Sequence, residues 1–143
     1  SGMTPESTVR AYYDALREGE SLAAFFLESP AAVKDGIGER LDGYAAIADG
    51  LGSQTARTRE WTVESDALQI VDRGDHAAVS DRVRMEWYDT DDFETHAYDT
   101  RWSGTLTRTD DSGVDSADAT AAGEDVVWKF AGMHVSVAGP TGE

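Results

Sequence analysis

His134 and Asp99, both in the C-terminal half of the chain, have side chains that could carry acid–base chemistry. A histidine titrates near neutral pH, so His134 could exchange a proton with a substrate. Asp99 lies among aromatic residues, and an aspartate partly removed from water is a stronger base. Both are therefore predicted catalytic residues. The structural alternative is that His134 bridges strands by hydrogen bonds and that Asp99 forms an ion pair with an arginine.

Arg84 and Arg101 are candidates for binding an anion. A buried arginine stays charged and needs a carboxylate, carbonyl groups or a bound anion as its partner. A small carboxylic acid held by both side chains would suit a mainly apolar pocket, with aromatic walls from Tyr13, Trp102 and Trp128. The alternative is that the two arginines pair across strands on a solvated face with Glu86, Asp99 or Asp81.

The other residue types with possible chemistry indicate neither a metal nor a cofactor. The chain has no cysteine, and its three histidines are dispersed, without the spacing of metal ligands. No glycine-rich phosphate loop, dinucleotide-binding motif or nucleophile elbow occurs. We therefore predict no metal, no cofactor and no cysteine nucleophile.

The elements that must position these residues follow from hydrophobic periodicity. Apolar residues at helical spacing predict three N-terminal helices over residues 5–19, 21–30 and 44–52, with a short extended piece at 32–37. Alternating β-branched and aromatic residues then predict strands near 60–72, 76–88, 93–109 and 125–138. Tight turns at 72–75 and 89–92 join the first three strands, and a longer hairpin loop joins the last two, so the sheet is expected to be antiparallel. The sequence predicts one α+β domain over residues 3–143, with the helices on one face of the sheet.

The assignment of residues to a site is sensitive to strand register. Successive side chains point to opposite faces, so a shift of one residue turns every named side chain away from the pocket. Residues 110–124, rich in Asp, Ser, Ala, Gly and Thr, are predicted to form a long solvated hairpin loop.

The last strand, from Trp128 through His134 to Ser136, and the earlier segment Asp99–Trp102 resemble the SnoaL-like branch of the NTF2-like superfamily. The resemblance extends from Thr4 to Val137. It implies a curved sheet wrapped around the helices as a cone, a pocket between them, and a homodimer formed through the sheet. The chain departs from the family pattern at Gly132, where a larger residue is usual, and in the loop at 110–124.

Composition excludes several partner classes. The chain has 143 residues and a formal net charge of −16, which opposes binding to nucleic acid or an anionic membrane. No run suits a membrane helix and no signal peptide is recognised, so a soluble, cytoplasmic protein is expected. Ser1 and Gly2 precede Met3 and look like the remnant of an expression tag. The dispersed acidic residues, with only Lys34 and Lys129 as lysines, resemble a haloarchaeal protein.

Together these features predict a protein that binds a small molecule in the cone. The reaction class suggested by the resemblance is a cofactor-independent isomerisation, cyclisation or dehydration by proton transfer. The alternative is a non-catalytic module of the same fold, which binds a ligand or associates with another subunit.

Overall fold

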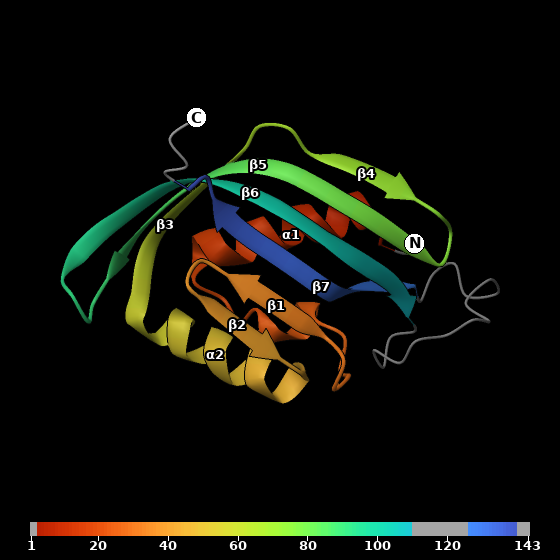
Figure 1. Cartoon of the computed structure of the whole chain (residues 1–143), viewed down its shortest axis with the longest axis horizontal. Helices are drawn as coiled ribbons and strands as arrows, with labels where there is room; N and C mark the ends of the chain where they lie inside the picture. Colours follow the sequence, from red (N-terminus) through yellow and green to blue (C-terminus); the bar gives the residue numbers. More distant parts are fainter. Residues whose placement is uncertain (1–2, 110–125, 140–143) are drawn as a thin grey trace.

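The computed structural model describes residues 3–109 and 126–139. In this part of the chain, one seven-stranded sheet curves over helix α1 (Pro5–Glu18), and helix α2 (Tyr44–Arg57) lies beside the first two strands (Figure 1). The predicted hairpin loop at 110–124 and residues 1–2, the predicted tag remnant, lie outside the described residues. No helix among the described residues is long and apolar enough to cross a membrane.

Helix α1 begins and ends where the sequence predicts. The Thr4 side chain accepts a hydrogen bond from the Ser7 backbone N–H, the Ser7 hydroxyl accepts one from the Thr4 N–H, and Pro5 occupies the first turn. Gly19 ends the helix with a left-handed backbone (φ 69°). The helix buries the side of Val9, Tyr12 and Leu16 against the sheet.

The predicted second helix is wrong, and the fold has two main helices rather than three. Residues 21–30 form only the short 3-10 helix η1 (Ala23–Phe25). The next residues bond to the last strand instead: Phe26 forms a parallel bridge with Phe130, and the Leu27 N–H donates to the Phe130 carbonyl at 2.9 Å. Burial of Leu22 and Phe26 in the core fixes this extended path, so tertiary packing overrides helical spacing.

The sheet is mixed rather than antiparallel. Its order is β2-β1-β7-β6-β5-β3, and β4 also pairs with β5. The predicted extended piece becomes β1, which pairs parallel with β7 and antiparallel with β2. The strands are β1 (Val33–Gly36), β2 (Glu39–Asp42), β3 (Thr58–Ser65), β4 (Gln69–Asp72), β5 (His76–Asp89), β6 (Glu94–Thr109) and β7 (Val127–Val137).

The predicted strand at 60–72 is two strands that pair with different parts of β5. Strand β3 pairs with its second half and β4 with its first half. Between them, the Asp66 N–H donates to the Arg82 carbonyl at 2.8 Å and the Ala67 N–H donates to the Asp81 carboxylate at 3.0 Å. The other three predicted strands agree with β5, β6 and β7 to within two residues at each end.

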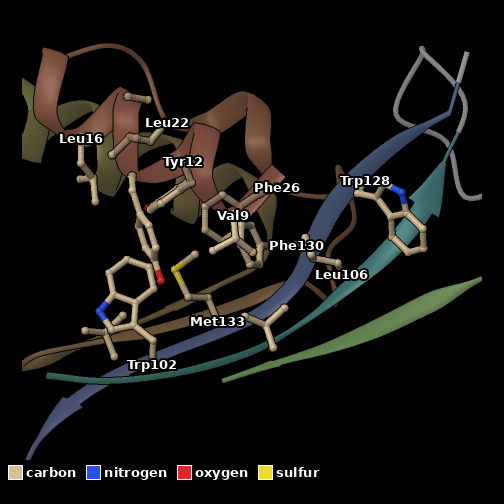
Figure 2. Close-up of a cluster of buried hydrophobic side chains, with 14 of the residues drawn as sticks. Val9, Tyr12, Leu16, Leu22, Phe26, Trp102, Leu106, Trp128, Phe130 and Met133 are labelled. Carbon is tan, nitrogen blue, oxygen red and sulfur yellow. The ribbon is translucent and has the colours of Figure 1, made fainter. Parts of the chain in front are cut away.

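The core lies between α1 and the concave face of the sheet, where α1 meets β6 and β7 (Figure 2). Strands β6 and β7 approach closely at a bulge, and a Cβ on Gly104 would lie 2.6 Å from the Gly132 carbonyl oxygen. Glycine at 104 is therefore required by the close approach of the two backbones.

Candidate functional site

Arg84 and Asp99 lie on the outer face of the sheet. On β5 the side chains of Val83 and Met85 are buried against the helices, so Arg84 between them points outward. Arg84 forms ion pairs with Asp99 at 3.3 Å and with Glu86 at 3.5 Å. The expected interior placement of Arg84 is wrong, and the cross-strand pairing on a solvated face, the stated alternative, is what the structure has.

Arg101 and His134 also lie on the outer face, where the structure brings them together. Both are exposed, and they line a shallow hollow of about 450 Å³ formed by β5, β6 and β7. The Arg101 guanidinium donates to the Ser136 hydroxyl at 3.4 Å and to the Val137 carbonyl at 3.2 Å. The interior placement expected for Arg101 is wrong, because strand alternation gives the inward position to Trp102.

Tyr13 and Trp128 are buried in the core. The Tyr13 hydroxyl donates to the Asp81 carboxylate at 2.7 Å, and the Trp128 indole N–H donates to the Met3 carbonyl at 3.1 Å. Trp102, the third predicted wall residue, contacts Tyr13 edge-on and lines the interior cavity.

Asp81 is a buried carboxylate with a structural role. Only 2% of the residue is exposed, and its two oxygens accept hydrogen bonds from the Tyr13 and Ser65 hydroxyls and from the Ala67 and Arg82 backbone N–H groups. All four distances are 2.6–3.0 Å. These contacts connect α1, β5 and the β3–β4 link, and Asp81 does not line the interior cavity.

The interior cavity lies between α1, the end of α2 and the concave face of the sheet. Its volume is about 110 Å³, far above the ~15 Å³ that one water molecule requires. It is lined by Tyr12, Leu16, Lys34, Ile37, Glu39, Gln54, Arg57, Thr58, Trp61, Met85, Trp87, Trp102 and Val135.

Three tryptophans form the apolar walls of this cavity. Trp61 and Trp87, on neighbouring strands, are stacked with ring centroids 4.7 Å apart and planes 19° from parallel. Trp102 meets the Tyr12 ring edge-on at 5.9 Å. The indole N–H groups of Trp61 and Trp102 are held by the Thr58 and Thr100 hydroxyls, each at 2.9 Å. Flat aromatic walls of this kind suit a planar, mainly apolar ligand.

Lys34 is the most unusual polar residue in the cavity. It is only 7% exposed, because β1 pairs in register with β7 and turns Lys34 to the same side as the buried Met133. Within residues 3–109 and 126–139, its ammonium has neither an ion pair nor a hydrogen bond. Burial lowers the pKa of Lys34 from 10.5, against the opposing effect of Glu39 and Asp35 nearby.

Tyr12 supplies a second polar group without a partner. The residue is 1% exposed, and Figure 2 shows its ring extending from α1 toward the sheet on the side of Trp102. Among the described residues its hydroxyl makes no hydrogen bond, although a buried tyrosine usually finds one. Burial also raises the pKa of Tyr12, so the phenol is a neutral donor at physiological pH.

The mouth of the cavity lies between the β1–β2 turn and the end of α2. Ile37 and Glu39 on the turn are exposed, and Arg57 at the end of α2 pairs loosely with Asp89 at 3.6 Å. A cation and an anion thus flank the entrance, with Lys34 and Tyr12 deeper inside.

Sequence reasoning missed the two polar residues of the cavity. Tyr12 was overlooked because helical spacing places both it and Tyr13 on the buried side of α1, and only the packing shows which hydroxyl has a partner. A signal for Lys34 was present, since the chain has only two lysines and this one follows the apolar run Ala31–Val33.

A possible metal-binding group occurs on the surface. Asp89, Asp92 and His96 place one ligand atom each within 4.8 Å of one another, and Asp92 and His96 already contact each other at 2.7 Å. Exposed acidic groups of this kind are common without an ion, so this cluster carries no assignment.

Comparison with known proteins places the chain in a family. A SnoaL-like domain model matches residues 6–112. No curated protein sequence matches the chain significantly.

Solved structures share the fold at low sequence identity. An NTF2-like superfamily protein from Salmonella enterica is 16% identical, with a TM-score of 0.71 over 94% of this chain and 88% of that one. A candidate dehydratase of the NTF2-like family from Streptomyces avermitilis is 17% identical, with a TM-score of 0.71 over 94% and 99%. A candidate aromatic ring hydroxylase from Novosphingobium aromaticivorans is 19% identical, with a TM-score of 0.72 over 94% and 87%. The chain therefore belongs to the SnoaL-like domain family, within the NTF2-like superfamily.

Proposed function

We propose that the chain is a small-molecule pocket protein. It binds a ring-sized, mainly apolar molecule in the interior cavity and transfers a proton at the molecule's oxygen-bearing end without a cofactor. The apolar part of the ligand contacts Trp61, Trp87 and Trp102, and its oxygen accepts hydrogen bonds from Lys34 and Tyr12. Names such as dehydratase and aromatic ring hydroxylase, given to proteins of this fold, support a small organic substrate.

The observation that carries the proposal is the burial of Lys34 without a partner. An ammonium removed from water costs several kcal/mol unless an acceptor compensates it. Among the described residues nothing supplies that acceptor, and the side chain borders a cavity with room for one. A carbonyl or carboxylate oxygen of a bound ligand would supply it.

The test is a thermal-shift titration with benzoate, benzaldehyde and cyclohexanone. A ligand that binds only the folded state at 100 times its Kd stabilises that state by about 2.7 kcal/mol, which raises Tm. We expect a rise for at least one of these probes, at least a ~10-fold weaker affinity in Lys34→Met, and a smaller loss in Tyr12→Phe, since a hydrogen bond to a charged donor is the stronger one.

Arg101→Ala and His134→Ala are the matched controls, since both residues line the outer hollow and neither lines the cavity. Binding lost in these variants but kept in Lys34→Met would contradict the proposal. Incorporation of deuterium from D2O next to the carbonyl of bound cyclohexanone separates an enzyme from a receptor, because only proton transfer exchanges that position.

A further inference from the structure

The Lys34 amine lies directly beside Gly36. Gly36 is two residues further along β1 and therefore on the same side of the strand. A Cβ at Gly36 would lie 2.8 Å from the Lys34 Nζ atom, so an alanine there would force the end of the lysine side chain to move. The amine thus lies against the Gly36 backbone, and Lys34 lines the edge of the cavity.

We infer that Lys34 is a covalent site for carbonyl compounds, whose amine condenses with an aldehyde or ketone bound against Trp61, Trp87 and Trp102. This inference rests on the proposed function and names the ligand class, since a carboxylate can bind Lys34 but cannot form this bond.

The condensation needs only groups that the cavity holds. The Nζ lone pair attacks the carbonyl carbon and a C–N bond forms. The two amine protons pass to the carbonyl oxygen, which leaves as water as the C=N double bond forms. The Tyr12 hydroxyl lines the same cavity, has no hydrogen-bond partner in the described part of the chain, and can donate to that oxygen. No atom is oxidised or reduced, so no further reactant is required. Burial lowers the pKa of Lys34, which increases the fraction of neutral, nucleophilic amine.

Lys129 is an internal comparison for this reaction. It is the only other lysine in the chain and lies on β7, where its partly exposed amine donates a hydrogen bond to the Ala24 carbonyl. It does not line the interior cavity. The two lysines therefore differ in whether they border an aromatic pocket.

The experiment is reductive trapping with benzaldehyde and sodium cyanoborohydride. The reductant converts an imine to a stable benzyl amine, and peptide mass spectrometry measures the modification at each lysine. In the folded protein we expect Lys34 to be modified at least ~10-fold faster than Lys129, and in urea the two rates to be equal. Equal rates in the folded protein, or faster modification of Lys129, would overturn the inference.

Two variants separate a reactive amine from a merely accessible one. Lys34→Arg keeps the charge and forms no imine, so benzyl modification at that position should vanish while that of Lys129 is unchanged. Gly36→Ala keeps the lysine but displaces its amine, and the preference for Lys34 over Lys129 should fall several-fold. Circular dichroism is used to check that both variants are folded. If the Gly36→Ala variant is folded and modified at the wild-type rate, the position of the amine beside Gly36 does not determine its reactivity. That outcome would count against the inference.

Quenching of tryptophan fluorescence by benzoate and benzaldehyde distinguishes failure of this inference from failure of the proposed function. Three of the four tryptophans line the cavity, so an occupant should change their emission. Quenching that depends on Lys34, without modification of Lys34, would leave the pocket intact and refute imine formation. Neither quenching nor modification would refute both.

Discussion

At the scale of single residues, Lys34 lowers the stability of the fold and provides the main polar contact for a ligand. A buried cation that has no partner among the described residues destabilises the fold, while its removal leaves the cavity without its principal polar group. Residues kept at such a cost are characteristic of sites rather than of cores.

The first prediction is that Lys34→Met stabilises the protein while weakening ligand binding. At neutral pH the free energy of unfolding should increase by about 1–3 kcal/mol, because a largely desolvated ammonium without a partner among the described residues is replaced by an apolar side chain. Urea denaturation measures this change. A destabilised variant would show that the lysine supports the fold.

The increase in the free energy of unfolding caused by Lys34→Met should also depend on pH. The pKa of Lys34 is lowered in the folded state, so between that value and 10.5 the unfolded chain binds more protons than the folded one. Wild-type stability therefore rises with pH relative to the variant across this window. The difference between the two proteins should shrink as pH approaches 10.5, and a constant difference would contradict the assignment.

Tyr12 and Tyr13 change the stability in the opposite direction to Lys34 as the pH rises above 10. Burial raises the pKa of both phenols above 10, and for Tyr13 the hydrogen bond to Asp81 adds to the rise. The unfolded chain releases these protons near pH 10 and the folded chain retains them, so the stability is complete below pH 10 and is lost above it. Two of the five tyrosines should thus ionise only as the chain unfolds. Tyrosinate absorbance followed beside circular dichroism measures this; ionisation of all five before unfolding would refute it.

At the scale of elements, the β3–β4 link depends on one carboxylate. The Asp81 carboxylate accepts hydrogen bonds from Tyr13 on α1, from Ser65 at the end of β3 and from the Ala67 backbone just after β3. Asp81 therefore fixes where β3 ends and how α1 lies on the sheet. From the sequence, Asp81 is predicted only as a possible ion-pair partner of Arg84 or Arg101 on a solvated face.

Asp81→Asn should destabilise the protein by about 2–4 kcal/mol, because an amide cannot accept hydrogen bonds at both ends and leaves a buried donor unpaired. Asp99→Asn is the matched control, since Asp99 is exposed and its loss should change stability by less than ~0.5 kcal/mol. Equal effects in urea denaturation would show that the buried network is not what stabilises this region.

At the scale of the whole molecule, a net charge of −16 makes stability depend on salt. The Debye screening length is ~3 Å at 1 M salt and ~30 Å at 0.01 M. At low salt the repulsion between carboxylates therefore extends much further and is stronger. We expect Tm to fall when KCl is reduced from 1 M to about 0.01 M. An unchanged Tm would show that the surface carboxylates are spaced widely enough to be neutral in effect.

Association through the sheet stays a prediction of the sequence. Arg82 and Arg101 are directly opposite each other on the outer face, and neither forms an ion pair among the described residues. Acidic groups of a second copy would compensate them. Light scattering in 1 M KCl should give twice 15.4 kDa, and Arg101→Glu should give the monomer. Arg10→Glu on α1 is the control, and a 15.4 kDa species for the wild type would contradict the prediction.

The sequence by itself determined the family, the α+β class, helix α1 and the three long strands, because these depend on local spacing, capping residues and alternation. The tertiary structure decided which face of each strand meets the helices. Arg84, Asp99, Arg101 and His134 share the outward parity, and alternation alone cannot say which parity is inside.

The parallel pairing of β1 with β7 was likewise beyond local reasoning, because it joins segments about 100 residues apart. That pairing turns Lys34 inward and brings it into the same cavity as Tyr12 and the tryptophans. The candidate site is thus a product of long-range strand pairing, whereas the sequence supplied its residue types.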